Sequence, residues 1–340
     1  MNFPRPIEII GGGLAGLSLG LALRRAGATV TLFETGIYPR HRVCGEFIAG
    51  LHSETIRRLG LAPILADALR HHEVAWFIGE RPARVQRLPS PALGLSRHTL
   101  DARLAEAFVA AGGTLHQHTR VTDTAAVPGR VFATGRRHGR SPWLGLKVHA
   151  LGLPLARDLE LHLGAQAYVG LARVDDRRVN VCGLFQRCEI SAKGPNLLLN
   201  YLQAAGLGQL TARLAAAEFD ADSFCAVAAV CFDSRVPVSD ELRIGDACAT
   251  IPPFTGNGMS MAFQSAELAL DPLLAYASGK SAWPEACHTA NVAVRRRFRV
   301  RLAAASCLHP FLLQPPWQRW LARLARARLL PLRPLYAALH

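Results

Sequence analysis

The sequence lacks the features that mark several other classes of protein. It has no run of about 20 uninterrupted apolar residues, so we expect no membrane-spanning helix. Its N-terminus, MNFPRPIEII, has no signal pattern of charged, then apolar, then small residues. None of its eight cysteines forms a C-x-x-C pair, so we expect no zinc or other metal site. Together these absences predict a cytoplasmic protein with reduced thiols and no disulfide framework.

Acidic residues are absent between Ala286 and His340, where ten arginines occur. Without those ten arginines, the net charge of +14 falls to about +4. A charge excess confined to one end of the chain says little about the fold. No nucleic-acid recognition motif accompanies it, so nucleic acid is not an expected partner.

A glycine-rich stretch near the N-terminus has the spacing of a dinucleotide-binding loop. It reads GGGLAG and matches G-x-G-x-x-G. Gly11 permits a tight turn, Gly13 lets the backbone approach a pyrophosphate, and Gly16 lets helix and strand pack closely. The flanking sequence predicts a strand before the loop and a helix and second strand after it, over residues 7–10, 17–25 and 28–33.

The residues beside this loop fit the same kind of ligand. The start of the helix, which includes Leu14 and Ala15, offers free N–H groups and a positive dipole end to phosphates. Glu34 follows the second predicted strand and can accept both ribose hydroxyls of an adenosine. A carboxylate there disfavours a 2′-phosphate, so NADP is a poor fit. These residues predict an adenine dinucleotide site, and they leave both NAD and FAD open.

A second glycine-rich stretch, RIGDACATIPPFTGNGM, supplies what a flavin needs beyond its ADP portion. Asp246 follows a short strand predicted over residues 242–245 and can bond ribitol hydroxyls. The helix predicted after it offers N–H groups that suit the N1–C2=O edge of a flavin, which becomes negative on reduction. The residues at this helix start are Gly256, Asn257, Gly258 and Met259. Together the two stretches predict FAD; a plain helix N-terminus after a proline and glycine turn is the alternative for the second.

The two stretches resemble the FAD-dependent oxidoreductases of the para-hydroxybenzoate hydroxylase fold, which include aromatic hydroxylases, flavin halogenases and geranylgeranyl reductases. PRHRVCGEFI, residues 39–48, is similar to a segment of the geranylgeranyl reductase-like branch. SRHTLDARLAEAFVAAGGTL, residues 96–115, is similar to the family's Arg-x-x-Leu-Asp helix. The resemblance implies that Arg42 and Arg97 approach FAD and that the backbone near Val121 meets the adenine. It also implies that Asp246 meets the ribitol and the pyrophosphate.

The sequence departs from that family in the motifs that concern the electron donor. Thr134 stands where the hydroxylases often carry the aspartate of an Asp-Gly motif implicated in FAD and NAD(P)H binding. A second G-x-G-x-x-G is also missing, so NADH or NADPH is expected to bind only transiently, as a reductant. The W-x-W-x-I-P signature of halogenases is absent.

The predicted fold class is α/β, with a Rossmann-like FAD-binding domain interleaved with a mixed-sheet substrate domain and followed by a helical C-terminus. Apolar residues alternate with a period of two in several segments of the middle of the chain. They predict strands in LKVHA and LELHL, a hairpin across Asp175–Arg177, and a buried strand over 224–232. One helix is predicted over 195–217. We expect an FAD-binding domain at 1–70, 96–142 and 236–285, a substrate-binding sheet at 71–95 and 143–235, and a helical segment at 286–340.

Cys44 is the candidate catalytic residue, because the family resemblance places VCGE near the flavin. A thiol there could shape the pocket or donate a proton; a small buried cysteine is the alternative. His116 and His118 have no third ligand nearby in the sequence, so they do not predict a metal site.

The segment PPWQRWLARLARARLL predicts an amphipathic helix. Trp317, Trp320, Leu321 and Leu324 share one face, and Arg319, Arg323 and Arg326 lie on another. Such a helix either packs on its own domain, which we favour, or lies on anionic lipid at the inner face of the membrane, as a peripheral contact.

These observations lead to a functional hypothesis with two alternatives. We expect an FAD-dependent oxidoreductase that acts on an apolar or aromatic small molecule, polyketide or isoprenoid-like, with a flavin monooxygenase (hydroxylase) favoured. The first alternative is a geranylgeranyl reductase-like flavin reductase of a carbon–carbon double bond. The second is a non-catalytic flavin-binding partner of another protein.

Overall fold

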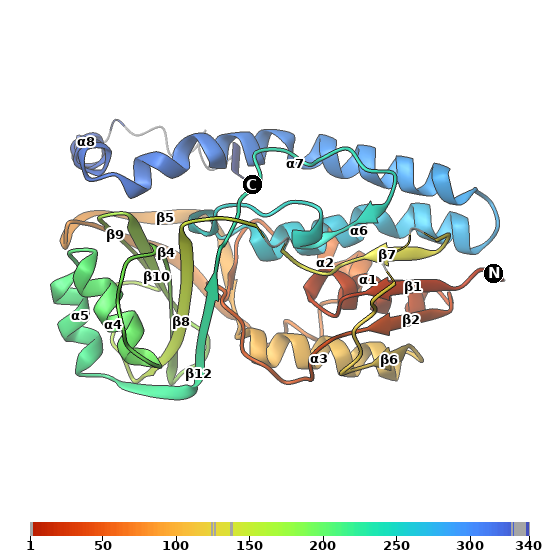
Figure 1. Ribbon diagram of the computed structural model, residues 1–340, viewed down its shortest axis with the longest axis horizontal. Coiled ribbons are helices and arrows are strands. Elements are labelled where there is room, and N and C mark those ends of the chain that lie inside the picture. Colours follow the sequence, from red (N-terminus) through yellow and green to blue (C-terminus); the bar gives the residue numbers. More distant parts are fainter. Residues whose placement is uncertain are drawn as a thin grey trace.

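Two β-sheets, lying side by side and bridged by one long helix, organise the chain (Figure 1). The computed structural model describes residues 3–123, 125, 127–136, 139–327, 329 and 338–339, with residues 325 and 326 described by their backbone alone. Sheet A lies toward the N-terminus, and sheet B lies at the opposite end of the molecule. This arrangement of a parallel sheet, a mixed sheet and C-terminal helices confirms the predicted fold class.

Sheet A is parallel throughout, and its strands are short; β6 at its edge has no buried residue. In spatial order they are β13 (Leu242–Arg243), β7 (Arg130–Phe132), β1 (Ile7–Ile10), β2 (Val30–Phe33) and β6 (Thr114–His116). Parallel neighbours need a crossover, and α1 (Leu14–Arg25) connects β1 to β2. The helix predicted from residue 17 thus starts three residues earlier, directly after the glycine loop.

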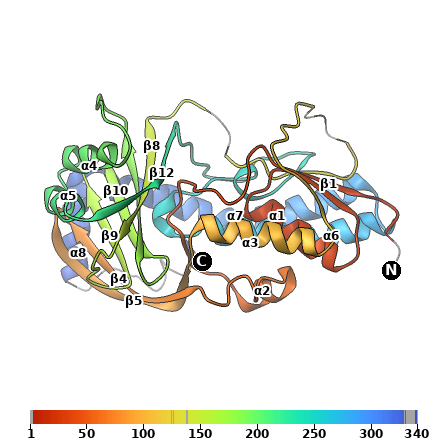
Figure 2. The same cartoon turned by 90° about the horizontal axis from the view of Figure 1, so that it is seen from below.

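The helices around sheet A close its hydrophobic core. The helix α1 contacts α3 (Arg97–Ala110), as Figure 2 shows, and also α2 (Ser53–Leu59) and α6 (Gly258–Ala277). Leu17 and Leu21 of α1, Phe108 of α3 and Phe263 of α6 belong to one buried cluster. Burying each such side chain contributes about 1.5–3 kcal/mol. This packing fixes the N-termini of α1 and α6 relative to each other.

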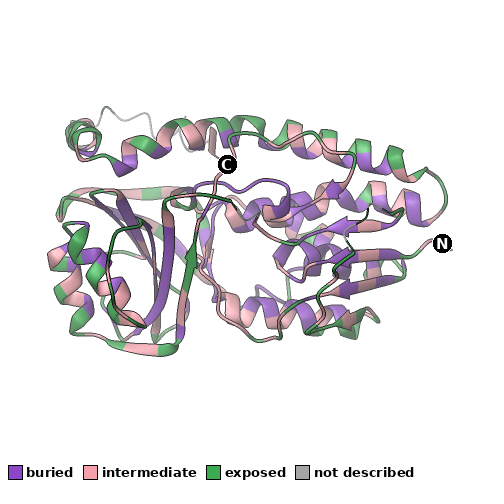
Figure 3. Ribbon diagram, viewed as in Figure 1, coloured by how far each residue is buried: buried purple, intermediate pink, exposed green. Residues whose placement is uncertain are grey.

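Sheet B has eight strands in mixed order, and its central strands are buried (Figure 3). Only β4 pairs in parallel, with β9; the remaining pairs are antiparallel. In spatial order the strands are β12 (Glu218–Ala228), β8 (Trp143–Leu151), β11 (Arg178–Gln186), β10 (Ala167–Arg173), β9 (Leu159–Gly164), β4 (Leu69–Ile78), β5 (Arg81–Gly94) and β3 (Phe47–Ile48). The predicted hairpin is confirmed, because β10 and β11 pair antiparallel across residues 174–177.

The helix α7 (Trp283–Leu313) runs along both sheets (Figure 1). It contacts α6 and β13 near sheet A and β9 and β10 of sheet B. It is followed by α8 (Pro315–Arg326), and two short 3₁₀ turns, η1 (Gly245–Ala247) and η2 (Pro253–Thr255), precede α6. Among the described residues, no helix has the length and hydrophobicity that crossing a membrane requires.

Two elements differ from the sequence-based expectation. The buried strand predicted over 224–232 is wrong: β12 spans Glu218–Ala228 at the edge of sheet B, and most of its residues are exposed or half-buried. The single helix predicted over 195–217 is wrong as well. Two helices occur there, α4 (Pro195–Ala204) and α5 (Gly208–Ala215), because Gly206 takes a left-handed backbone conformation between them.

The C-terminal helix α8 packs on its own protein through only part of the predicted face, because Leu321 packs against a buried cluster and both tryptophans are partly exposed. Gln318 is buried, and its side-chain amide donates to the backbone carbonyls of Gly164 and Leu312. Trp317 and Trp320, in contrast, are 45% and 48% exposed. The expectation that both tryptophans pack internally is therefore wrong.

Candidate functional site

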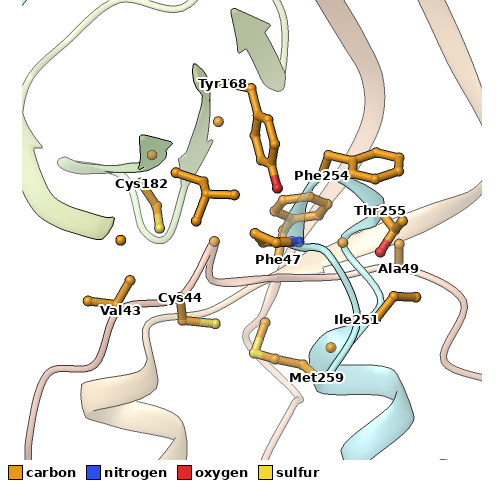
Figure 4. Close-up of a pocket in the computed structure, with 18 of the residues that line it drawn as sticks. Val43, Cys44, Phe47, Ala49, Tyr168, Cys182, Ile251, Phe254, Thr255 and Met259 are labelled. Carbon is orange, nitrogen blue, oxygen red and sulfur yellow. The ribbon is translucent and has the colours of Figure 1, made fainter. Parts of the chain in front are cut away.

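A cavity of about 780 Å³ lies between the two sheets. The β1–α1 loop, the residues before β3 and the N-terminus of α6 form one part of its wall. Strands of sheet B, the end of α7 and Leu321 of α8 form the other part. Figure 4 shows side chains from both parts, among them Cys44, Met259, Tyr168 and Phe254. One space thus joins a glycine-rich loop to an apolar chamber.

The three glycines of the first motif occupy different positions around this space. A side chain on Gly11 would collide with the Ala133 backbone, and one on Gly16 would collide with the Gly11 carbonyl. Both glycines therefore permit close packing of the loop, and neither lines the cavity. Gly13 does line it, and no atom lies within 4 Å of where its Cβ would be. Open space beside a bare backbone at a helix start is what an approaching pyrophosphate requires.

Glu34 lies at the end of β2 beside this loop, although it does not line the cavity. Its carboxylate accepts from the Gly12 and Gly36 N–H groups, each at 2.8 Å, and pairs with Arg40 at 2.7 Å. Burial acts to raise the pKa of Glu34, but the Gly36 N–H and the Arg40 guanidinium hold it below its usual value. The carboxylate is therefore ionised and held against the loop.

Arg42 and Arg97 both line the cavity and share one buried carboxylate. Asp101 is fully buried and accepts from Arg97 Nε and Nη2 at 2.7 and 2.8 Å, and from Arg42 Nε at 3.1 Å. Burial by itself would lower the pKa of Arg97, but Asp101 raises it above its usual value. Two permanent positive charges therefore lie beside the cavity, held by one aspartate.

The second glycine-rich stretch reaches the same cavity from the opposite side. Asp246 lines it within η1, and Gly258 begins α6 with no atom within 4 Å of its Cβ position. Gly256 has a left-handed backbone, and a side chain there would collide with the Phe47 ring. Met259 also lines the cavity. The helix starts of α1 and α6 thus open onto one space.

Asn257 and Val121 are two predicted site residues that do not line the cavity. Asn257 is buried, and its side-chain amide donates to the Leu339 carbonyl at 2.5 Å. Within the described part of the chain, its Oδ1 atom has no hydrogen-bond partner. Val121 lies in the loop after β6 and is not among the described residues that line the cavity.

Arg136 is a site residue that the sequence reasoning missed. It lines the cavity, and its Nε lies 3.4 Å from Asp246 Oδ2. Burial raises the pKa of Asp246, and the Arg136 guanidinium acts against that rise. The signal was the arginine pair directly after Thr134 and Gly135, the segment where an aspartate was expected.

Cys44 lines the cavity near Cys182 of β11 (Figure 4). Burial raises the pKa of the Cys44 thiol, and the nearby Arg97 only partly opposes this. The Sγ atom accepts from the Glu46 N–H at 3.5 Å. The side chain is therefore a neutral thiol, which can donate a proton but is not poised as a thiolate nucleophile.

The half of the cavity bordered by sheet B is mostly apolar. Its wall comes from the inner face of the sheet and from the helices that cover it: Trp76, Leu161, Tyr168, Leu184, Phe311 and Leu321. Four polar side chains also line this half: Arg84, Gln86, Glu160 and Tyr168. Figure 4 shows the Tyr168 hydroxyl pointing toward Phe254 and Phe47. This half suits an apolar or aromatic molecule.

The residues present fit FAD. The open position at Gly13 and the start of α1 suit a pyrophosphate, and Asp246 and the start of α6 lie where ribitol and a flavin ring would follow. A flavin mononucleotide has no pyrophosphate, so it would leave the open position at Gly13 and the start of α1 without a partner.

Comparison with known proteins agrees with this fit. Residues 5–141, less than half of the chain, match a family described as the FAD binding domain. The menaquinone reductase of Mycolicibacterium smegmatis is 28% identical over 138 residues, which is 39% of this chain and 34% of that protein. The chain thus matches about a third of the length of this curated relative.

Solved structures show the same fold over nearly the whole chain. PqsL of P. aeruginosa, solved with 2-aminobenzoylacetate, superposes with a TM-score of 0.73 over 92% of this chain and 98% of PqsL, at 16% identity. The flavin-dependent brominase Bmp2 superposes with a TM-score of 0.74 over 100% of this chain and 93% of Bmp2, at 17% identity. This chain therefore shares the fold of PqsL and Bmp2.

Proposed function

We propose that this protein is an FAD-dependent monooxygenase that hydroxylates an apolar or aromatic small molecule. The observation that carries the proposal is the single cavity, which joins a dinucleotide cradle to an apolar chamber. The likeness to PqsL and Bmp2 supports it, since both are flavin enzymes of this fold. When bound and reduced, FAD would supply the electrons and the oxygen chemistry.

The residues of the chain have distinct parts in this proposal. Gly13, Leu14 and Ala15 hold the pyrophosphate, while Gly11 and Gly16 keep the loop tight. Glu34 binds the ribose, and the Val121 backbone meets the adenine. Arg42, Arg97 and Arg136 supply positive potential beside the phosphates, and Asp246 bonds the ribitol. The N–H groups of Gly258 and Met259 stabilise negative charge on the flavin edge. Gly256 and Asn257 form the turn that presents them, because their own N–H groups donate to the Pro253 carbonyl and to Thr255 Oγ1.

In this proposal, the inner face of sheet B excludes water from the cavity and orients the substrate. The neutral Cys44 thiol shapes the cavity or donates a proton there. We keep the division into an FAD-binding domain and a substrate domain at the predicted boundaries as part of this proposal, and the two separate sheets support it. NADH or NADPH serves as a transient reductant.

A second candidate is a reductase of a carbon–carbon double bond on an isoprenoid-like substrate, the geranylgeranyl reductase-like branch. The 28% sequence identity to a menaquinone reductase over 138 residues favours this candidate. The third candidate, a non-catalytic flavin-binding partner, requires that no reductant is turned over.

Reduction followed by oxygen exposure separates these candidates. We expect the purified protein to release FAD, identified by mass spectrometry, and to be reduced anaerobically by NADH or NADPH. On mixing with oxygen, a monooxygenase is expected to be reoxidised within seconds in a stopped-flow spectrometer, and a reductase only over minutes. Release of FMN, or of NAD alone, contradicts the cofactor assignment, and the absence of any turnover favours the non-catalytic partner.

We also propose that α8 makes a peripheral contact with anionic lipid. Trp317 and Trp320 are both about half exposed, and Arg319 and Arg323 are exposed on the same helix. Arg326 was part of the predicted basic face, but its side chain lies outside the described residues. Aromatic rings beside cations are the pattern of a helix at the membrane interface.

Vesicle sedimentation tests this contact. The protein is expected to sediment with anionic vesicles and not with neutral ones, and to be released as salt rises, because each arginine contributes about 1 kcal/mol through a screened potential. Replacing Arg319 and Arg323 together by glutamine should abolish sedimentation and leave FAD bound. Replacing Arg157, which is exposed in the loop before β9, by glutamine is the control. Equal sedimentation of the protein with anionic and neutral vesicles would contradict the proposed contact.

A further inference from the structure

A buried polar cluster lies behind the cavity wall, where the segment before β3 meets β8. Glu46, Lys147 and His149 are fully buried, and His41 is half-buried. Burying ionised groups costs free energy, so such a cluster rarely serves stability alone. The proposed function gives none of these four side chains a part.

Short contacts connect the four side chains in the order His149, Glu46, Lys147, His41. His149 Nε2 lies 2.6 Å from Glu46 Oε2, and the backbone N–H of Arg97 donates to Glu46 Oε1 at 2.9 Å. Lys147 Nζ lies 3.6 Å from Glu46 Oε1 and 3.1 Å from His41 Nδ1. Glu46 therefore holds Lys147 on one side, and Lys147 meets His41 on the other.

A metal ion is the first alternative for this cluster. Ligand atoms of His41, Glu46 and His149 all lie within 4.8 Å of one another, close enough to share one ion. However, Lys147 already contacts two of these three residues with its ammonium group. A divalent cation would face that positive charge at short range, so Lys147 takes the place of the cation.

Lys147 determines which ring nitrogen of His41 carries the hydrogen. An ammonium group has only donors, so His41 Nδ1 must accept, and the proton of the neutral ring is on Nε2. Burial, followed by the charge of Lys147, lowers the pKa of His41 to about 4. His41 lines the cavity, and its ring stacks on His98 with centroids 4.5 Å apart. At neutral pH it therefore offers a single N–H donor.

The groups that face this imidazole come from several elements. Lys147 and His149 face it from β8, His98 faces it from α3, and Glu46 faces it from the segment before β3. Of these, Glu46 alone acts to raise the pKa of His41. Cys182 and Cys225 lie opposite Lys147 on the neighbouring strands, so sheet B encloses the lysine from both sides.

We propose that Lys147, held by Glu46, positions His41 as a hydrogen-bond donor in the cavity wall, and that the ligand carries an oxygen acceptor, such as a carbonyl or a phenolic oxygen, that this N–H binds. Lys147 and Glu46 are positioning residues, and His41 is the residue that touches the ligand. The proposal deepens the proposed function, on which it rests for the class of molecule that the cavity takes.

The protonation state of His41 tests the positioning step without any turnover. In ¹⁵N-histidine NMR of the FAD-loaded protein, the His41 signal, assigned with His41→Phe, is expected to show an Nε2–H tautomer that does not titrate between pH 6 and 8. Lys147→Met should move its titration upward, and Lys147→Arg should restore the wild-type behaviour. A wild-type His41 in the Nδ1–H form, or titrating near pH 6.5, overturns the proposal.

The ligand step is tested with 1-naphthol and naphthalene as probes, followed by the change in flavin absorbance. The preference for 1-naphthol is expected to be about fivefold greater in the wild type than in His41→Phe, as the loss of one hydrogen bond predicts. The exposed His72 provides the control, and His72→Phe should keep the wild-type ratio. An unchanged ratio in His41→Phe, or failure of both probes to bind, overturns the ligand assignment.

Metal analysis of the wild-type protein completes the test. Equimolar bound metal would overturn the proposal, because the ion would then occupy the position assigned to Lys147. None of these measurements uses oxygen or a reductant. Failure of the monooxygenase proposal, seen as slow reoxidation, can therefore be distinguished from failure of the His41 assignment.

Discussion

Replacing Gly13 by valine is expected to weaken FAD binding by at least about a hundredfold, which corresponds to about 2.7 kcal/mol. The Cβ position of Gly13 faces open space in the cavity, with no protein atom within 4 Å of it. It would instead occupy the space that the pyrophosphate needs beside the start of α1. The measurement is the dissociation constant of FAD for apoprotein, obtained from quenching of flavin fluorescence.

The control for this variant is Gly208→Val at the first position of α5. Its Cβ position is similarly uncrowded, with the nearest atom 3.6 Å away in the side chain of Gln203, but it lies outside the cavity. This variant should bind FAD as the wild type does. If Gly13→Val retained wild-type affinity, the cofactor phosphates would have to lie elsewhere.

Replacing Asp101 by alanine is expected to lower the free energy of unfolding by about 3–5 kcal/mol, as breaking a buried ion pair does. Asp101 is fully buried and accepts hydrogen bonds from two arginines, which the substitution would leave without their partner. The measurement is urea denaturation of the apoprotein, which avoids the stabilisation that bound FAD adds.

The matched control is Asp271→Ala. Asp271 also pairs with an arginine, Arg58, but its side chain is 72% exposed. Exposed pairs contribute at most about 1 kcal/mol, so this variant should unfold at nearly the wild-type urea concentration. Equal losses in the two variants would show that Asp101 is not the anchor of Arg42 and Arg97.

The parts of the fold that local spacing determines could be predicted from the sequence. The loop Gly11–Gly16 and the hairpin between β10 and β11 each depend on residues close together in the chain. The strand predicted over 224–232 failed because hydrophobicity alone does not tell how many layers cover a strand. There β12 is an edge strand, and Val227 on it is 37% exposed.

The polar contacts of the site could not be predicted, because they join segments far apart in the chain. Arg136 meets Asp246, and Glu46 meets His149 across 103 positions. The buried cluster around Glu46 had one weak signal in the sequence. Lys147 is one of only three lysines, and it interrupts an apolar strand, where a buried charge requires a partner.

The position of α7 determines how a substrate can reach the cavity. This helix has 31 residues, so it is about 46 Å long, and it contacts β13 of sheet A as well as β9 and β10 of sheet B. A hinge opening between the sheets would require such a rod to bend or to detach from one of them. We therefore expect entry by a local displacement of α8 from β5, the two contacting elements whose Leu321 and Leu88 form part of the cavity wall. A membrane that held α8 would then lie beside the entrance, and an apolar substrate could pass from lipid to the cavity without crossing water.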